Sequence, residues 1–402
     1  MKMNKSRHTF EWGDGVFTLL SWFRQDLVRN ARVLVAGAGA LGNEVVKDLA
    51  LFGVGHIYVV DFDRIELSNL TRSVLFREED ALAHAYKAEV VANRAKEINH
   101  QIHVVPIVGD LFSDVGFGIY RAADVVIGCL DSRIARYLLN RLALRAGKTW
   151  IDGSIENLTG NVKVFSPGVN CYECCLSREE FGNIMLRTGC ADVVRTQVKG
   201  GRVATTPISA SIIGAMQVQE AMKVIHRETE AATQFRTLEG EVLHYEGMTN
   251  SMRIYKYDMW KKRCTAHERW DNITEGPGMS AQMTAGEALG NLKKLLKVKS
   301  VEINMRNNKF VDKIVADSTD QEFCVMMAES RLERHISNDA ELRRLSYHNK
   351  FYKSFFTDIN NDFPYKDLTL KQIGIPPFDV VQVTTPKGLY FVELSDDKQL
   401  FI

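Results

Sequence analysis

The sequence lacks a long apolar run, and neither sign of charge prevails in it. A membrane-spanning helix needs about 18 or more apolar residues in a row, and no stretch of this chain approaches that length. The basic first residues are not followed by the apolar core of a secretory signal peptide. We therefore expect a soluble, cytoplasmic protein without a membrane segment.

The balance of charge and the cysteine content narrow the possible partners. The 51 basic residues nearly equal the 50 acidic ones, which argues against an extensive nucleic-acid or membrane interface. Internal repeats and low-complexity segments are absent, and 402 residues are enough for two or three domains. Seven cysteines, an odd number, predict reduced thiols that serve a metal or catalysis.

A strand, a glycine turn, a helix and a second strand are predicted in succession within residues 32–63. Residues 33–36 form an apolar run short enough for a buried parallel strand, and residues 57–60 form another. Residues 41–52 are predicted to be helical, and the second strand ends at Asp61. This order is typical of a nucleotide-binding βαβ unit.

The turn after the first strand has a G-x-G-x-x-G pattern in Gly37, Gly39 and Gly42. The first two glycines let the backbone turn tightly and approach phosphates, and the third lets helix and strand pack closely. The helix N-terminus offers free N–H groups to an anion. Asp61 follows about 20 residues later, where a carboxylate can accept the ribose hydroxyls. By itself the pattern fits several nucleotides.

Strands and helices continue to alternate after this unit, which predicts a Rossmann-like, doubly wound and mostly parallel sheet. The helices are expected at 87–98, 132–146 and 207–226, and the strands at 102–106, 125–129, from 150, at 159–166, 242–245 and 253–257. Residues 1–30 are a lead-in with a short helix or docking segment. Residues 171–206 hold four cysteines and predict a long loop or a crossing segment, and loops of this length are usually functional.

A polar stretch with a Gly-Pro-Gly sequence, residues 271–280, predicts a domain boundary. We therefore divide the chain into a first domain at 31–270, a linker at 271–284 and a C-terminal domain at 285–402. The C-terminal domain is predicted to be α+β. Its expected elements are a helix at 285–296 and strands at 301–304, 310–314, 380–384 and 388–393.

Polar side chains that suit a triphosphate follow the predicted strands. Asn69, Arg72 and Lys87 fit a triphosphate better than a dinucleotide, because two cations can balance charge on the α-phosphate and on departing pyrophosphate. Ordinary surface salt bridges are the alternative for both cations. Asp131 follows the strand at 125–129 and can hold Mg²⁺ beside phosphate oxygens. Its alternative role is to cap the next helix.

The chain resembles the adenylating enzymes that activate ubiquitin-like proteins, the ThiF/MoeB/ubiquitin-type superfamily, which includes bacterial sulfur-carrier activators and eukaryotic ubiquitin-type activating enzymes. The resemblance covers about residues 30–265 in order. It rests on VAGAGALG, VVDFDRIELSNLTRSVLF, KAEV, CLDSRIARYLLN, IDGSIENLTGNVKVFSPGVNCYECCL and TTPISASIIGAMQVQEAMK.

This resemblance implies a site for ATP and Mg²⁺. Asp61 would hold the ribose, Asn69, Arg72 and Lys87 the phosphates, and Asp131 the Mg²⁺. The implied nucleotide-binding residues are Gly37, Gly39, Ala40, Gly42, Asp61, Asp63, Asn69, Arg72, Lys87 and Asp131.

An N-terminal arginine is implied as well. Arg24, in the segment WFRQ, resembles the arginine that reaches the phosphates of an opposed subunit or half. The spacer from Arg24 to the first strand is shorter than in most relatives, and Arg29 is the alternative. An opposed half implies a homodimer or a paired subunit.

A structural zinc site is the next implication. Cys171 and Cys174 form a C-x-x-C pair, which lets two thiolates face one metal. The family has a second C-x-x-C after the core domain, where this chain has Cys264 and His267. Three cysteines and one histidine are a sound ligand set for Zn²⁺. The alternative is that Cys264 is an ordinary residue and the zinc is lost; Cys175 is not expected to be a ligand.

Cys190 resembles the thioester cysteine of the family, which precedes the helix that begins with Thr-Pro. A thiolate that attacks an acyl-adenylate gives a thioester without a further cofactor. The alternative is a buried structural cysteine. Cys129 and Cys324 are expected to be packing residues.

The C-terminal segment LTLKQIGIPPFDVVQVTTPKGLYFVEL resembles the end of the catalytic subunit of the NEDD8-activating enzymes. It implies a ubiquitin-fold (β-grasp) domain that recruits a conjugating enzyme. Sulfur-carrier activators usually lack such a domain, so the resemblance favours conjugation. The layout also fits a bacterial ubiquitin-like conjugation operon.

The expected function is ATP-dependent activation of a ubiquitin-like protein, with thioester formation on Cys190 and transfer to a conjugating enzyme. A sulfur-carrier adenylyltransferase is the main alternative. A nicotinamide-dependent oxidoreductase is a further alternative, but it gives no reason for Arg72, Lys87, the zinc set and Cys190 together. A non-catalytic adaptor would keep the fold and the zinc but would need neither Asp131 nor Cys190.

Overall fold

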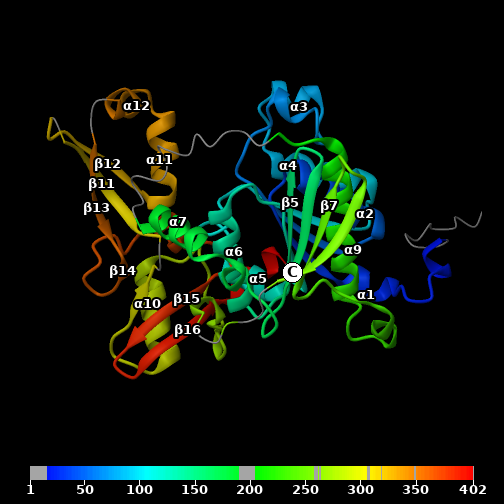
Figure 1. Cartoon of the computed structure of the whole chain (residues 1–402). Coiled ribbons are helices and arrows are strands. Elements are labelled where there is room, and N and C mark those ends of the chain that lie inside the picture. The colour runs from blue at the N-terminus through cyan, green and yellow to red at the C-terminus, as the bar shows by residue number, and fades with distance from the viewer. Residues whose placement is uncertain are drawn as a thin grey trace, which may run out of the picture. The chain divides into compact units, whose positions relative to one another are not determined.

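The computed structural model describes residues 16–189, 204–257, 261, 264–305, 308–317, 319–347 and 350–401. The chain divides into two compact units (Figure 1). The first comprises Met1–Val108 and Ala122–Arg269, and the second comprises Gly109–Arg121 and Trp270–Ile402. Within the described residues, no helix is long and apolar enough to cross a membrane.

The first unit is built on an eight-stranded sheet in the order β3-β2-β1-β4-β5-β6-β7-β8. The strands are β1 (Arg32–Ala36), β2 (His56–Val60), β3 (His103–Ile107), β4 (Val125–Gly128), β5 (Trp150–Glu156), β6 (Thr159–Phe165), β7 (Glu241–Glu246) and β8 (Ser251–Lys256). Neighbouring strands from β3 to β5 are parallel, and those from β5 to β8 are antiparallel. The predicted α/β fold with a mostly parallel, Rossmann-like sheet is confirmed.

Helices cover this sheet and connect its parallel strands (Figure 1). The helices of the first unit are α1 (Gln25–Asn30), α2 (Ala40–Phe52), α3 (Glu78–Leu82), α4 (Lys87–Ile98), α6 (Arg133–Arg145), α7 (Arg178–Gly189) and α9 (Pro207–Ile225). Helix α5 (Phe117–Ala122) belongs to the second unit except for its last residue. The short 3₁₀ helices of this unit are η1 (Val16–Leu19), η2 (Leu67–Asn69), η3 (Glu173–Cys175), η4 (Glu230–Gln234) and η5 (Thr265–His267). Apolar residues of α1, α2, α4 and α9 share one core with β1, β2 and β4.

The ends of α2 and α9 follow from their sequences. Gly53 caps α2 with a left-handed backbone, φ +76°, which glycine adopts without the steric cost of a side chain. The Thr206 hydroxyl caps α9 by accepting the Ser209 N–H, and Pro207 follows as the first helical residue.

The stretch 171–206, expected to be one long loop, contains α7 over its middle part, so the loop prediction is wrong there. The start of this helix is explained by a reciprocal cap. The Ser177 hydroxyl accepts the Glu180 N–H, and the Glu180 carboxylate accepts the Ser177 N–H. This Ser-x-x-Glu spacing is a recognised helix start, and the cysteine and glycine content of the segment hid it.

The second unit contains two sheets. The five-stranded sheet has the order β14-β10-β15-β16-β9, and the three-stranded sheet has the order β12-β11-β13. The strands are β9 (Ile273–Gly276), β10 (Glu302–Asn304), β11 (Phe310–Ala316), β12 (Glu322–Ala328), β13 (Phe351–Phe356), β14 (Asp358–Ile359), β15 (Val380–Thr385) and β16 (Gly388–Leu394). Helices α10 (Ala285–Leu296), α11 (Glu329–Asn338), α12 (Ala340–Ser346), α13 (Leu370–Ile373) and η6 (Ser395–Leu400) complete it. That this unit is a ubiquitin fold stays a prediction.

Two chain segments enter the second unit where the sequence did not suggest it. Residues 271–284, expected to be a linker, contain β9, which pairs in parallel with β16. The segment Gly109–Arg121 belongs to the second unit although the chain before and after it belongs to the first.

The segment Gly109–Arg121, here called the crossover, is held by residues near the C-terminus. The Phe117 N–H donates to the Asp379 carboxylate at 2.8 Å, and the Gly118 N–H donates to the Phe378 carbonyl at 2.9 Å. A Cβ on Gly118 would overlap that carbonyl oxygen. Arg121 forms an ion pair with Glu393, whose side chain is 8% exposed. These contacts make the crossover part of the core of the second unit.

Candidate nucleotide site and metal centre

The carboxyl ends of β1, β2 and β4 meet at one edge of the sheet, because β1 pairs in parallel with both neighbours. The Gly37 N–H donates to the Val60 carbonyl at 2.9 Å, and the Cys129 N–H donates to the Ala36 carbonyl at 2.8 Å. The glycine turn, Asp61 and Asp131 leave the sheet from these three neighbouring strand ends. Ligands of open parallel sheets bind at such an edge.

The glycine turn needs two of its glycines for close backbone packing. Gly37 has φ +101°, and a Cβ there would overlap the carbonyl oxygen of Cys129. A Cβ on Gly42 would overlap the carbonyl oxygen of Gly37. Among the described residues, none except the chain neighbours of Gly39 has a heavy atom within 4 Å of a Cβ built there, so this part of the structure leaves space beside Gly39. Ala40 follows as the first residue of α2 and turns its N–H toward the helix N-terminus.

Asp61 is fixed by two backbone hydrogen bonds. One carboxylate oxygen accepts the Ala38 N–H and the other accepts the Asp63 N–H, each at 2.8 Å. Burial raises the pKa of Asp61, and the nearby Lys87 ammonium works against that rise. An ionised carboxylate has about four acceptor positions, so two remain for hydroxyl groups of a ligand.

Lys87 lies beside this carboxylate at the first position of α4. Its ammonium contacts the Asp63 carboxylate at 2.8 Å, and its N–H donates to the Asp63 carbonyl at 2.9 Å. The Lys87 side chain is only 12% exposed. The ion pair anticipated as the alternative is therefore present, in a place where the ammonium also acts on Asp61.

Asn69 and Arg72 are held by their own loop. The Asn69 side-chain oxygen accepts the Glu66 N–H at 3.0 Å, and the Arg72 guanidinium donates to the Ser68 carbonyl at 2.7 Å. Both contacts organise the segment around η2. A role for either residue at phosphates stays a prediction.

Asp131 follows β4 and is exposed. The cap of α6 is the Ser132 hydroxyl, which accepts the Ala135 N–H at 3.0 Å, so the alternative of Asp131 as helix cap is wrong. A role for Asp131 in Mg²⁺ binding stays a prediction.

Two residues that sequence reasoning missed secure this strand end. The Arg136 guanidinium pairs with Asp152 at 2.8 Å and donates to the Leu130 carbonyl at 2.6 Å. The Gln217 amide donates to the Gly128 carbonyl at 2.9 Å. Arg136 and Gln217 lie on apolar helix patterns, and nothing in those patterns distinguishes a polar anchor from a surface residue.

Arg24, the candidate N-terminal arginine, directly precedes α1, pairs with Asp26 of that helix at 2.8 Å and is more than half exposed. The backbone N–H of Arg24 donates to Nε2 of the buried His226 at 3.0 Å. The alternative, Arg29, is also exposed. Cys190 lies outside the described residues.

The structure brings together the four residues expected to bind zinc. Ligand atoms of Cys171, Cys174, Cys264 and His267 all lie within 4.8 Å of one another. Burial raises the pKa of Cys171 and Cys264 and lowers the pKa of His267. Metal binding would offset the cost of ionising buried thiols.

Polar contacts around this group tie its two halves together. The Asn140 amide donates to the Cys171 sulfur at 3.2 Å. The Arg141 guanidinium donates to the Glu173 carboxylate at 2.7 Å and to the Thr265 hydroxyl at 2.8 Å. Second contacts of this kind orient metal ligands.

The remaining cysteines differ in exposure. The Cys175 thiol donates to the Cys171 carbonyl at 3.1 Å, and Cys175 is not in the four-residue group. Burial raises the pKa of Cys129, as expected of a packing residue. Cys324 is exposed on β12, so its prediction as a packing residue is wrong.

Several known proteins are similar to this chain in sequence. The chain is 30% identical to the SAMP-activating enzyme E1 of Haloferax volcanii over 58% of this chain and 79% of that protein. It is 31% identical to the sulfur carrier protein adenylyltransferase of Thermus thermophilus over 57% of this chain and 79% of that protein. It is 36% identical to the NEDD8-activating enzyme E1 catalytic subunit of Arabidopsis thaliana over 38% of this chain and 36% of that one. The chain thus spans about a third of the NEDD8 relative.

The family profile agrees with these relatives, whose names divide between activating enzymes and an adenylyltransferase. The predicted resemblance to an enzyme superfamily of ThiF/MoeB type is confirmed at the level of the family. The profile of the ThiF family matches residues 14–266, more than half of the chain, and the protein belongs to the ThiF family.

Proposed function

We propose that this protein activates a ubiquitin-like protein. It adenylates the C-terminal carboxylate of that protein with release of pyrophosphate, transfers the acyl group to Cys190, and passes it to a conjugating enzyme. The observation that carries the proposal is the convergence of the glycine turn, Asp61 and Lys87 at one edge of the parallel strands. Family membership supports the adenylation step.

The residues at this edge fit ATP. The space beside Gly39 and the N-terminus of α2 suit phosphate oxygens. The free acceptor positions of Asp61 suit the two hydroxyls of a ribose. Lys87 and Arg72 would supply positive charge for the phosphates, and Arg72 would have to exchange its hydrogen bond to the Ser68 carbonyl for a phosphate oxygen.

Adenylation is a displacement at the α-phosphorus. A carboxylate oxygen of the ubiquitin-like protein forms a bond to that phosphorus, and the bond to the β-phosphate breaks as pyrophosphate leaves. Lys87 and Arg72 stabilise the charge that develops on the phosphate oxygens. Asp131 would hold the Mg²⁺, which supplies further charge compensation when bound.

The second step makes the thioester. The Cys190 thiol loses its proton, its sulfur attacks the acyl carbon, and the bond to AMP breaks. A cysteine of the conjugating enzyme then takes the acyl group by exchange. The second unit is proposed to recruit that enzyme, on the strength of the ubiquitin-fold resemblance of residues 285–402.

Zinc is proposed for the group of three cysteines and His267. A tetrahedral zinc with thiolates at about 2.3 Å needs its ligand atoms about 3.8 Å apart, and the four atoms lie within 4.8 Å of one another. Small side-chain movements would close that gap. The metal would join the start of the segment before Cys190 to the end of the first unit.

A homodimer or a second subunit is proposed to complete the nucleotide site, with Arg24 or Arg29 supplied from the opposed half. A sulfur-carrier adenylyltransferase is the second candidate, because the Thermus thermophilus relative has that name. Such an enzyme would release the acyl-adenylate for thiocarboxylate formation without a thioester to a conjugating enzyme.

Modifier-dependent ATP–pyrophosphate exchange followed by a non-reducing gel tests the proposal. Asp131→Ala should abolish exchange because charge compensation is lost, whereas Cys190→Ala should keep exchange and lose the thioester band. Cys175→Ala is the matched control and should keep both. Exchange at wild-type rate in Asp131→Ala, or a dithiothreitol-sensitive adduct in Cys190→Ala, would refute the assigned roles.

A further inference from the structure

Asn43, in the first turn of α2, is a fully buried polar residue outside the nucleotide-binding set. Its amide nitrogen donates to the Ala38 carbonyl and to the Gly39 carbonyl, each at 2.9 Å. Its amide oxygen accepts the Leu75 N–H at 2.9 Å. Both donor hydrogens and the acceptor are thus in use, so the orientation of the amide is determined by its partners.

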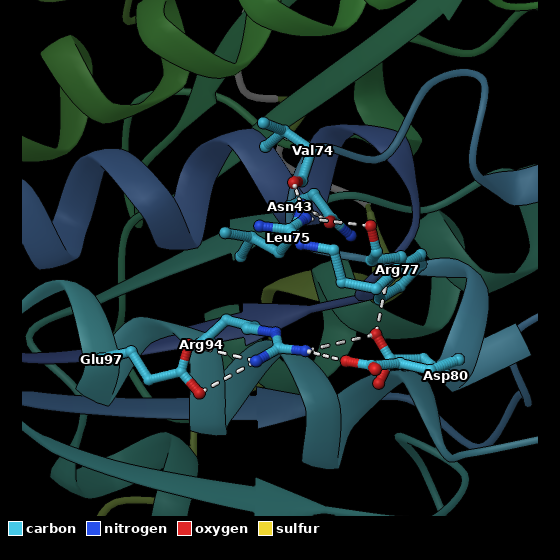
Figure 2. A network of polar contacts seen from close by, with 9 residues as sticks. Asn43, Val74, Leu75, Arg77, Asp80, Arg94 and Glu97 are labelled. Atoms are coloured by element: carbon cyan, nitrogen blue, oxygen red, sulfur yellow. Dashed lines mark hydrogen bonds and ion pairs between the residues drawn. The ribbon is translucent and has the colours of Figure 1, made fainter. Parts of the chain in front are cut away.

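These three bonds join two segments that are far apart in the sequence. Ala38 and Gly39 belong to the glycine turn, and Leu75 lies three positions after Arg72. Figure 2 shows Asn43 beside Leu75 and Val74. The turn expected to bind phosphates and the loop that carries Arg72 are therefore fastened to one side chain.

Arg77 anchors the other side of the chain turn at Leu75. The Arg77 guanidinium donates to the carbonyls of Val74 and Phe76 at 2.9 and 3.0 Å (Figure 2). The Arg77 N–H donates to the Asp80 carboxylate at 2.8 Å. The turn is thereby held from both sides.

Arg94 extends this anchorage to α4. Its guanidinium lies between Asp80 of α3, at 3.8 Å, and Glu97 of α4, at 3.0 Å (Figure 2). Helix α4 begins at Lys87. One polar network thus extends from the glycine turn through the Leu75 turn to the helix that carries Lys87.

We propose that Asn43 is a positioning residue that holds the glycine turn and the Arg72 loop in register as one phosphate-binding wall. The inference rests on the proposed function, because it assigns these two segments to one ligand. A buried amide suits this task, since its planar group has three bonds in fixed directions and no charge that would disturb the phosphates.

Asn99 offers a matched control in the same unit. It is also fully buried, its amide nitrogen donates to the Ala50 carbonyl at 3.1 Å, and its oxygen accepts the Gln101 N–H at 3.0 Å. Ala50 lies in the last turns of α2, whereas Asn43 lies in the first. A purely structural role predicts the same consequences for both residues.

The test compares Asn43→Ala with Asn99→Ala in the full chain. Both should lower the melting temperature, because each leaves buried backbone groups without partners. Only Asn43→Ala should lower kcat/KM for ATP in pyrophosphate exchange, by about 100-fold if the wall shifts by 1 Å. The KM for the ubiquitin-like protein should be unchanged. Equal kinetic losses in the two variants would overturn the proposal.

Asn43→Asp separates the bonds of Asn43 to the glycine turn from its bond to Leu75. It replaces Asn43→Ala in the test if that variant does not fold. It has the same shape and keeps the acceptor for Leu75, but it places a carboxylate oxygen against the Ala38 and Gly39 carbonyls. ATP affinity should fall, and normal affinity would contradict the proposal. Added to Arg72→Ala, the change Asn43→Ala should cost less than it does alone, because part of its effect acts through Arg72.

Calorimetric binding of ATP with Mg²⁺, without any ubiquitin-like protein, distinguishes failure of the proposal from failure of the proposed function. If the wild-type protein binds ATP but no ubiquitin-like protein supports its pyrophosphate exchange, only the proposed function is refuted. The affinities of Asn43→Ala and Asn99→Ala would then still decide the role of Asn43. A wild-type protein that binds no ATP would overturn both.

Discussion

Two loops leave the same edge of the parallel sheet and are stabilised by residues of different units. The loop after β2, residues 61–86, carries Asp61 and Arg72 and is fastened by polar contacts within the first unit, through Asn43, Arg77 and Arg94. The crossover after β3 is fastened by residues of the second unit, whose sequence positions are about 260 residues away. The first loop can therefore form without the second unit, whereas the crossover cannot.

The two kinds of contact also differ in chemistry. Apart from the buried Asn43, the loop after β2 is held by side chains that are at least partly exposed, such as Arg77 and Arg94. In the crossover, Phe117 and Tyr120 are at most 1% exposed, and Gly116 and Gly118 approach the backbone near Phe378 too closely for a side chain. The second unit is therefore built from two separate segments of the chain, and the crossover is one of them.

Removing residues 270–402 should have the largest effect. The truncation takes away every second-unit partner that follows the crossover, and Phe117 and Tyr120 would become exposed. We expect aggregation or loss of cooperative unfolding. Soluble yield, dye binding to exposed apolar surface and thermal melting measure it.

A cut in the same place is the control for truncation. A protease site inserted between Asp271 and Asn272 breaks the chain but keeps the contacts of the C-terminal fragment with the crossover. The two fragments should migrate together in gel filtration after cleavage. Separate migration, or a truncated protein with a wild-type melting curve, would break the comparison.

Metal removal should have the next largest effect and should act on the first unit. Chelation opens the group of Cys171, Cys174, Cys264 and His267 and releases a segment of about 90 residues. Structural zinc contributes on the order of 10 kcal/mol in small domains, so a clear fall in melting temperature is expected.

The metal content of variants identifies the ligands. His267→Ala and Cys264→Ala should lose the metal, whereas His267→Cys should keep it because thiolates are good zinc ligands. Cys175→Ala is the matched control. Metal analysis that finds no zinc in the wild type, or equal zinc in both alanine variants, would contradict the ligand set.

Two ion pairs, one in each unit, test whether deeper burial makes the loss of a partner more costly. Removing one partner of a buried pair costs about 3–5 kcal/mol. The Arg136–Asp152 pair of the first unit has side chains 11% and 5% exposed, and the Arg121–Glu393 pair of the second unit has 35% and 8%. Arg136→Met should therefore lower the free energy of unfolding more than Arg121→Met. Chemical denaturation measures both, and the reverse order would contradict this reasoning.

The smallest effect concerns the pH dependence of the second unit. The Glu287 carboxylate accepts the N–H and hydroxyl of Thr284 at the start of α10, and these bonds lower the pKa of Glu287 from its ordinary value. Its stabilising contribution is therefore present at neutral pH and is lost as the pH falls through the lowered pKa. Glu287→Gln should be less stable than wild type at pH 7, and the difference should vanish in acid.

The matching cap of α13 serves as the control, because it uses Gln372 with Thr369 and has no charge. The effect of Gln372→Ala should not vary with pH. A pH dependence in both caps would mean that another group titrates in this unit.

Much of the first unit follows from local sequence. Helix α4 has the predicted bounds, and the glycine turn, β1 and β2 lie where the apolar runs and glycines placed them, because a βαβ unit is specified by residues within about 30 positions. The grouping of Cys264 and His267 with the C-x-x-C pair came from the family pattern, and the structure brings the four residues together.

The rest could not be read locally. The crossover has the composition of an ordinary connection, and its partners near Asp379 and Glu393 are distant in sequence. Asn43 occupies a helical position where its sequence neighbours predict only an amphipathic face. Its importance comes from the Leu75 N–H, which tertiary structure alone brings near. Helix α7 is a different case, since its Ser177–Glu180 cap was visible and was outweighed by composition.

The crossover has a consequence for synthesis of the protein. Phe117 leaves the ribosome 262 residues before Asp379, its hydrogen-bond partner. At about 5–20 residues per second, the crossover waits roughly 15–50 s before its partners exist. During that time its apolar side chains are uncovered while β1 to β4 can already pair. Chaperone demand of the nascent chain should therefore be greatest in this interval and should end only when the last strands are made.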